Sequence, residues 1–244
     1  MVVDHIERVH APRRTHRKIA PADLVASRGG RYARALGIEL AAADPGERFK
    51  WFLAALLYGT RISESLATRT WHAFKAHGVL SPERVAQTGW DGLVRILDAG
   101  GYARYDYKTA TKLLAICAAL MNRYAGDLDA LHTAAADMPE LESRLKALGK
   151  GIGTVTIGIF LRELRGIWSL ADPPLSPLAL AAAIDLGYLL PDIKDADRAL
   201  LRLRQIWHTS GQPALAFADF ESALVREGLR LRRLASHRRG DAPC

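Results

Sequence analysis

Helical spacing of apolar residues runs through most of this 244-residue chain and constrains its fold more than any other feature. The stretch 49–59, FKWFLAALLYG, is apolar nearly all round, as a buried helix is. The stretch 153–160, GTVTIGIF, would also suit a β-strand, because Val, Thr and Ile favour strands. It has no hairpin partner nearby in the sequence, so we expect a helix there too. The pattern predicts an all-α fold of about ten helices joined by short connections.

Residues with known preferences for helix ends divide the chain into these helices. Ser81 is a predicted N-cap, because a proline and a glutamate follow it in the first turn. Ser176, which is followed by another proline, predicts a second start of the same kind. Gly78 is a predicted C-cap. The segment 21–42 is expected to hold one or two short helices.

The charge of the chain indicates a polyanionic partner. The formal net charge is +8 and the isoelectric point is about 9.7, and a basic globular chain often binds polyanions. Arginine outnumbers lysine, which suits phosphate recognition but would equally follow from a GC-rich genome. The basic tail from Arg230 to Arg239 would either track a nucleic-acid backbone or form a solvated helix face.

The two cysteines, Cys117 and Cys244, form neither a disulfide framework nor a metal-binding pattern. Cys117 lies in an apolar run and is expected in the core. No stretch is long and apolar enough for a membrane span, and the N-terminus lacks the apolar core of a signal peptide. We therefore expect a cytoplasmic protein, associated with the nucleoid in a prokaryote, that has no membrane partner.

Three closely spaced glycines, Gly149, Gly151 and Gly153, separate two predicted helices in the sequence LGKGIG. A glycine turn lets the backbone approach an anion closely, and the helix behind it exposes amide groups and the positive end of its dipole. Ile152 would pack inward and hold the two helices together. The turn predicts a phosphate cradle. The alternative is an ordinary glycine-rich turn between helices.

The order of motifs around this turn resembles the helix-hairpin-helix (HhH-GPD) superfamily of base-excision DNA glycosylases, of the endonuclease III type. The resemblance covers roughly residues 49–187. It is carried by FLAALLYGTRISESLATRTW, GGYARYDYKTATKLL, DLDALHTAAADMPELESRLKALGKGIG and SPLALAAAIDLGYL. It implies a two-lobed all-α fold with DNA in the cleft. Residues 49–165 would form a helical barrel that ends in the hairpin, and 1–48 plus 166–244 would form the second domain.

The resemblance implies a monomeric DNA N-glycosylase of base excision repair that binds duplex DNA and flips a damaged base out of the helix. The hairpin residues implied to hold a DNA phosphate are Gly149, Lys150, Gly151, Gly153 and Thr154. A structural cation at the hairpin is a further expectation. The iron–sulfur cluster of many relatives needs four cysteines, which this chain lacks after the hairpin.

The implied catalytic residues depart from the family pattern. Bifunctional members carry a nucleophilic lysine where this chain has Val155, so a Schiff-base lyase is not expected. Lys150 would be a substitute nucleophile or, alternatively, a phosphate contact. The catalytic aspartate of the family corresponds to Asp172 when counted from the hairpin, and to Ser176 when counted back from the following helix. With Asp172 the enzyme would be a monofunctional glycosylase.

With Ser176 at that position the carboxylate is lost. The alternative function is then a catalytically inactive DNA-binding protein, either a damage sensor or an architectural factor. A third possibility is an all-α protein-interaction domain in which the hairpin is only a turn.

Two loops are candidates for contacting the bases. In the loop YGTRIS, Thr60 or Arg61 would fill the gap left by the flipped base, although a solvent-facing arginine is the alternative. In GGYARYDYK, aromatic and basic side chains alternate, which suits base stacking with phosphate contact, although the rings would equally suit the core. The candidates in this second loop are Tyr102, Tyr105, Tyr107 and Lys108. His132 and Trp168 are expected to be packing residues.

Overall fold

A computed structural model describes residues 19–104, 106–193 and 195–240, and within these ranges the chain is helical without β-strands. The first helices are α1 (Pro21–Arg28), α2 (Tyr32–Ala35), α3 (Pro45–Tyr58), α4 (Glu64–Ala76), α5 (Pro82–Ala99) and α6 (Asp106–Tyr124). They are followed by α7 (Leu128–Thr133), α8 (Met138–Lys146), α9 (Thr154–Glu163), α10 (Pro177–Asp185), α11 (Ala196–Thr209), the short 3₁₀ turn η1 (Ala214–Ala216) and α12 (Phe217–Gly240). The all-α prediction is confirmed.

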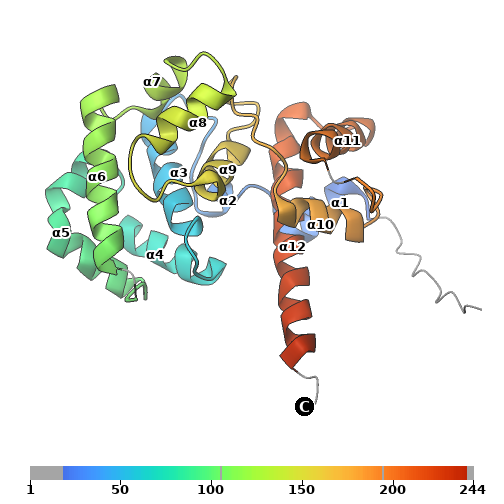
Figure 1. The fold of residues 1–244 in the computed structure, drawn as a ribbon, viewed down its shortest axis with the longest axis horizontal. Helices are drawn as coiled ribbons and strands as arrows, with labels where there is room; N and C mark the ends of the chain where they lie inside the picture. Colours follow the sequence, from blue (N-terminus) through green and yellow to red (C-terminus); the bar gives the residue numbers. More distant parts are fainter. Residues whose placement is uncertain (1–18, 105, 194, 241–244) are drawn as a thin grey trace, which may run out of the picture.

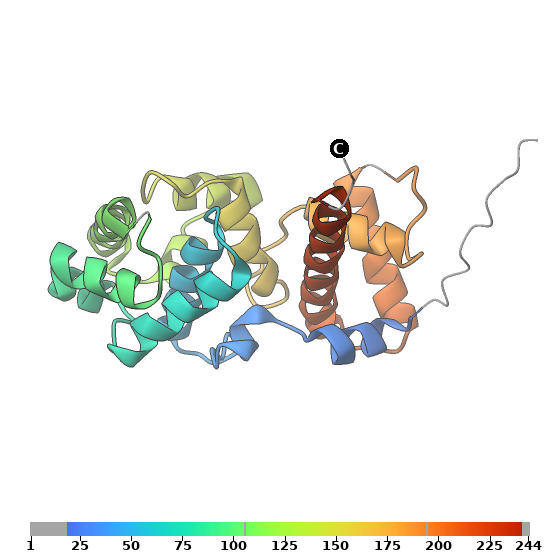
Figure 2. The same cartoon turned by 90° about the horizontal axis from the view of Figure 1, so that it is seen from below.

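The helices form two groups that lie side by side (Figures 1 and 2). Helices α3 to α9 pack around one another in the first group, and α1, α10 and α11 pack on the long helix α12 in the second. In the first group α3 is the central element, and its Trp51 and Phe52 are fully buried. The Trp51 indole donates a hydrogen bond to the Phe160 carbonyl (3.0 Å), and the Phe52 and Phe160 rings meet edge to face. These contacts fix α9 against α3.

The second group depends on a close approach between α10 and α12. A Cβ atom at Gly228 would lie 2.3 Å from the carbonyl oxygen of Leu178, so a larger residue would push the two helices apart. Trp207 of α11 stacks on Phe220 of α12, with ring centroids 5.4 Å apart. Helix α12 therefore serves as the support on which the other helices of this group pack.

Most local predictions are confirmed. The stretch 153–160 is helical and begins α9. Ser81 and Ser176 cap their helices, with side chains that accept from the amides of Arg84 and Ala179. Gly78 follows the end of α4 with a φ of +66°. The predicted core and packing positions are confirmed as well, because the structure buries Cys117, stacks His132 on Trp168 and buries Trp168.

Three details differ from the sequence-based expectations. The short helix α7 was not expected. The helix expected over 153–160 runs on to Glu163 as α9, where the chain turns to reach the second group. The expected domain boundary between residues 48 and 49 falls inside α3, which begins at Pro45.

Buried charged residues join the two groups of helices. Arg165, which follows α9, donates from Nε to Glu221 of α12 (2.7 Å), and both side chains are at least 96% buried. Glu163 at the end of α9 accepts from the Ser222 hydroxyl of α12 (2.6 Å) and from the Ala33 amide of α2 (3.0 Å). Asp219 of α12 accepts from the Arg31 amide (2.9 Å). We call Glu163, Arg165, Asp219 and Glu221 the ionic seam.

No helix within the described ranges is both long and apolar enough to cross a membrane.

The ionic seam generates a stability prediction. The substitution Arg165→Met would leave the Glu221 carboxylate buried without its cationic partner, so we expect a loss of about 3–5 kcal/mol in the free energy of unfolding. The double variant Arg165→Met/Glu221→Leu removes both charges and should recover much of that loss. Urea denaturation of the wild type and the three variants, including Glu221→Leu, measures the coupling. Additive losses would contradict a direct interaction.

A second prediction concerns pH. The hydrogen bond from Arg230 lowers the pKa of Glu227 below its usual 4.5, Arg28 adds to this effect, and burial opposes it. Because the pKa is lower in the folded state, the carboxylate stabilises the fold above pH 4.5, and this stabilisation is lost as the pH falls through the lowered pKa. The variant Glu227→Gln should lose about 1 kcal/mol at neutral pH. Thermal melts should show that this difference shrinks at acidic pH, and a constant difference would contradict the assignment.

Candidate nucleic-acid interface

The hairpin between α8 and α9 is held by apolar anchors and turns its middle outward. Leu148 and Ile152 are buried, while Lys150 and Gly151 between them are exposed. The Ile152 amide donates to the Gly149 carbonyl (3.4 Å) and closes the turn. Ile152 thus packs inward as predicted, and the turn presents its backbone to the outside.

Two of the glycines are required by the geometry of this turn. Gly149 lies so close to α6 that a Cβ there would stand 2.7 Å from Ile116 Cγ1. Gly151 has a φ of +100°, a backbone conformation that residues other than glycine rarely adopt. A Cβ at Gly151 would also lie 3.0 Å from Lys112 Nζ. The hairpin therefore packs directly on α6, and a lysine of α6 lies at its turn.

The third glycine leaves the start of α9 open. Gly153 is the N-cap of α9 and offers no side-chain cap to the amides of the first turn. A Cβ at this position would meet nothing within 4 Å, so the approach to the helix start is clear. An uncapped helix start attracts anions through its free amides and its dipole. Lys150 and Lys112 add positive charge on the same side of the hairpin.

The position of the family lysine holds an exposed apolar side chain. Val155 is 68% exposed in the first turn of α9, beside the exposed Thr154. Thr156 turns inward and packs against Gly59, where a Cβ would clash with the Thr156 hydroxyl. The first turn of α9 therefore offers a hydroxyl and backbone amides but no amine.

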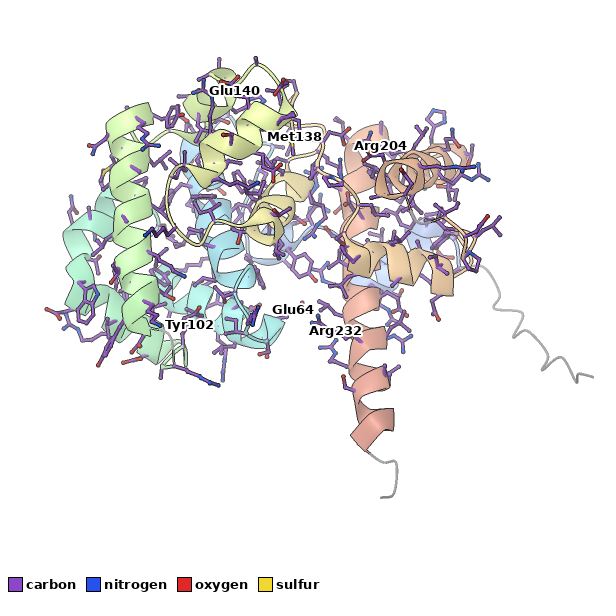
Figure 3. All side chains as sticks on the ribbon, in the orientation of Figure 1. Glu64, Tyr102, Met138, Glu140, Arg204 and Arg232 are labelled. Atoms are coloured by element: carbon purple, nitrogen blue, oxygen red, sulfur yellow. The ribbon has the colours of Figure 1, made fainter. Side chains whose placement is uncertain are left out.

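The two candidates for the catalytic carboxylate position have different structural roles. Asp172 lies in the connection between α9 and α10, and its side chain is 50% exposed. It accepts hydrogen bonds from Arg165 and from Arg204 of α11, so both of its oxygens are engaged by guanidinium groups. Ser176 caps α10, and its hydroxyl accepts from the Ala179 amide (3.2 Å). Figure 3 labels Arg204 on α11.

The wedge candidates lie in the turn between α3 and α4, directly after Gly59, which packs against Thr156 in the first turn of α9. The Thr60 hydroxyl donates back to the Leu57 carbonyl (2.7 Å), while Arg61 is exposed. Glu64, at the start of α4, lies on the side of its group that faces α12, where Arg232 lies (Figure 3). Of the two wedge candidates, Thr60 and Arg61, Arg61 has the more accessible side chain.

The tyrosine candidates separate into one buried and one exposed residue. Tyr102 is only 3% exposed, so the core alternative holds for this residue and its ring is not available to a base. Tyr107 is 60% exposed at the start of α6, and Lys108 beside it is exposed as well. Tyr105 lies outside the described residues. Tyr107, Lys108 and Lys150 line one surface groove.

Sequence reasoning missed two residues of this groove, Trp90 and Lys112. Trp90 is 40% exposed. From the sequence alone, a tryptophan in a helix with apolar spacing would be expected in the core. Lys112 lies one helical turn after Lys108, and this spacing in the sequence indicates that both lysines lie on the same face of the helix.

The basic tail and a cation at the hairpin are two further expectations for this interface. Arg230 pairs with Glu227, and side chains from residue 237 onward lie outside the described residues. Within the described ranges, no three or more His, Cys, Asp or Glu residues gather as a metal site. A cation at the hairpin would have backbone carbonyls as ligands, and that of Gly149 already accepts from Ile152.

No family model matches the sequence, and no curated protein matches it either. The likeness to helix-hairpin-helix glycosylases therefore stays a resemblance of motifs, and the geometry of the hairpin carries the functional argument.

Proposed function

We propose that the protein binds duplex DNA by holding one backbone phosphate at the hairpin 149–153. The observation that carries this proposal is the uncapped start of α9 behind a glycine turn, with Lys150 and Lys112 beside it. Phosphate oxygens suit this arrangement because backbone amides, a helix dipole and two ammonium groups all favour a negative charge. The net charge of +8 adds a favourable long-range attraction to DNA.

Binding of this kind contacts the DNA backbone and reads no sequence directly. It predicts an affinity that falls as salt is added, because each neutralised phosphate releases counterions. The lysines would position the duplex, and the hairpin would fix its register.

Gly153 offers a sharp test of the hairpin. Its backbone is extended (φ −99°, ψ 175°) and its Cβ direction is open, so Ser and Asp should both fit and cap α9. The variant Gly153→Asp places a negative charge where the phosphate would lie, and we expect it to lower the affinity for DNA by about tenfold or more. The matched comparison Gly153→Ser caps the helix without charge, so it occupies amides of the first turn but adds no repulsion, and we expect a smaller loss of affinity than Gly153→Asp gives.

Fluorescence anisotropy with a labelled duplex at several salt concentrations makes the measurement. Thermal melts check that both variants are folded. Equal affinities for the wild type, the Asp variant and the Ser variant would contradict a phosphate site at the hairpin.

A monofunctional DNA N-glycosylase is the second candidate function, and Asp172 favours it. This half-exposed carboxylate follows α9 where the resemblance puts the catalytic aspartate. A carboxylate there would stabilise the positive charge that develops on the sugar or orient the attacking water. Val155 supplies no amine, so no Schiff base would form. Because Arg165 and Arg204 already offset the charge of Asp172, we place DNA binding ahead of excision.

A strand-cleavage assay separates the two candidates. The protein meets labelled duplexes with single damaged bases, with and without hot alkali, beside the variant Asp172→Asn. A glycosylase would give alkali-dependent cleavage of one lesion, and the variant would lose at least about a hundredfold in rate. Cleavage without alkali would point to an amine, with Lys150→Gln as the next variant. Tight binding without any product would leave the DNA-binding function and exclude Asp172 catalysis on those lesions.

A further inference from the structure

A groove of about 460 Å³ lies on the first group of helices, outside the ionic seam and apart from Asp172. Helices α5 and α6 form its walls, and the hairpin borders it through Lys150 (the fold is shown in Figure 1). Its functional side chains are Trp90, Tyr107, Lys108, Thr111, Lys112 and Lys150. We call it the aromatic–lysine groove.

The aromatic wall of the groove is exposed and held in place. The Trp90 and Tyr107 rings have centroids 5.2 Å apart and are tilted by 38°. The Trp90 indole donates to the Thr111 hydroxyl (3.0 Å), which itself donates to the Tyr107 carbonyl (2.9 Å). The indole edge is thus fixed to α6, while the Trp90 and Tyr107 side chains stay 40% and 60% exposed.

The exposure of Trp90 is unusual within this chain. All five tryptophans lie in the described ranges, and the other four are at most 4% exposed. A kink in α5 at Gly89 (φ +66°) comes directly before Trp90. The backbone therefore changes direction where the indole is presented. Exposed aromatic area beside positive charge indicates a binding surface.

The charge of the groove is of one sign. Lys108 and Lys112 lie one turn apart on α6, and Lys150 faces them from the hairpin. None of the residues that line the groove is acidic. A ligand that complements this groove carries flat apolar rings and several negative charges close together.

We propose that the aromatic–lysine groove binds an unpaired stretch of a DNA strand. Its bases would stack on Trp90 and Tyr107, and its phosphates would lie against Lys108, Lys112 and Lys150. Bases within a duplex are already stacked and offer no ring face to a protein surface, so an aromatic wall of this kind serves unpaired bases. The groove borders the hairpin, and this inference rests on the proposed phosphate site there. The preferred substrate is then a duplex that continues into an unpaired strand.

Intrinsic fluorescence gives a direct test, because Trp90 is the exposed indole among the five. Titration of the full chain with oligo(dT) should quench the emission in a saturable way, and the variant Trp90→Phe should lose the quenching while it keeps most of the affinity. The variant Tyr107→Ala should bind oligo(dT) and a duplex with a single-stranded tail at least about fivefold more weakly. Its matched control Tyr107→Phe keeps the ring and should bind as the wild type does.

Binding of a blunt duplex separates this inference from the proposed function. The groove is supported if Tyr107→Ala weakens tailed DNA but changes the blunt-duplex affinity less than about twofold. It is overturned if blunt and tailed DNA weaken equally or not at all, and the hairpin proposal survives if Gly153→Asp still weakens both. Equal quenching by poly-glutamate would also overturn it, because charge alone would then suffice. If oligo(dT) quenches Trp90 but no duplex binds, the groove stands and the duplex proposal falls.

Discussion

The contact between Arg165 and Glu221 is the interaction on which the arrangement of the two helix groups depends. Both charges are removed from water, so each requires its partner to offset the cost of desolvation. The same guanidinium also donates to Asp172 and to the Pro173 carbonyl, so one side chain ties α9, α12 and the connection to α10 together. With Glu163 and Asp219, this network holds the hairpin side of the molecule in a fixed relation to α12.

The Arg165 network also limits what Asp172 can do in catalysis. The residue that a glycosylase would use as its carboxylate is already engaged by Arg165 and Arg204. Ser176, the other candidate, caps α10. Both residues therefore have structural roles, whereas the hairpin exposes Lys150, Gly153 and an open helix start that have no evident role in packing the core. For this reason DNA binding is the proposed function, and base excision is the second candidate.

Helix α6 connects the hairpin with the aromatic–lysine groove. Its Ile116 packs against Gly149, and its Lys112 lies at Gly151, so the hairpin packs on α6 as well as on its own helices. The same helix carries Tyr107 and Lys108 into the groove. A phosphate at the hairpin and a base in the groove would therefore be held by one rigid element.

The sequence by itself determined the helical class, most helix limits and the hairpin, because spacing of apolar residues, caps and glycine turns act within a few residues of chain. It did not separate Tyr102 from Tyr107, since the two occur in the same aromatic loop and only packing buries the first. It likewise gave no sign that Trp90 is exposed or that Arg165 binds Glu221, 56 residues later in the chain. Tertiary structure decided these points, because desolvation and charge pairing depend on which distant helices meet.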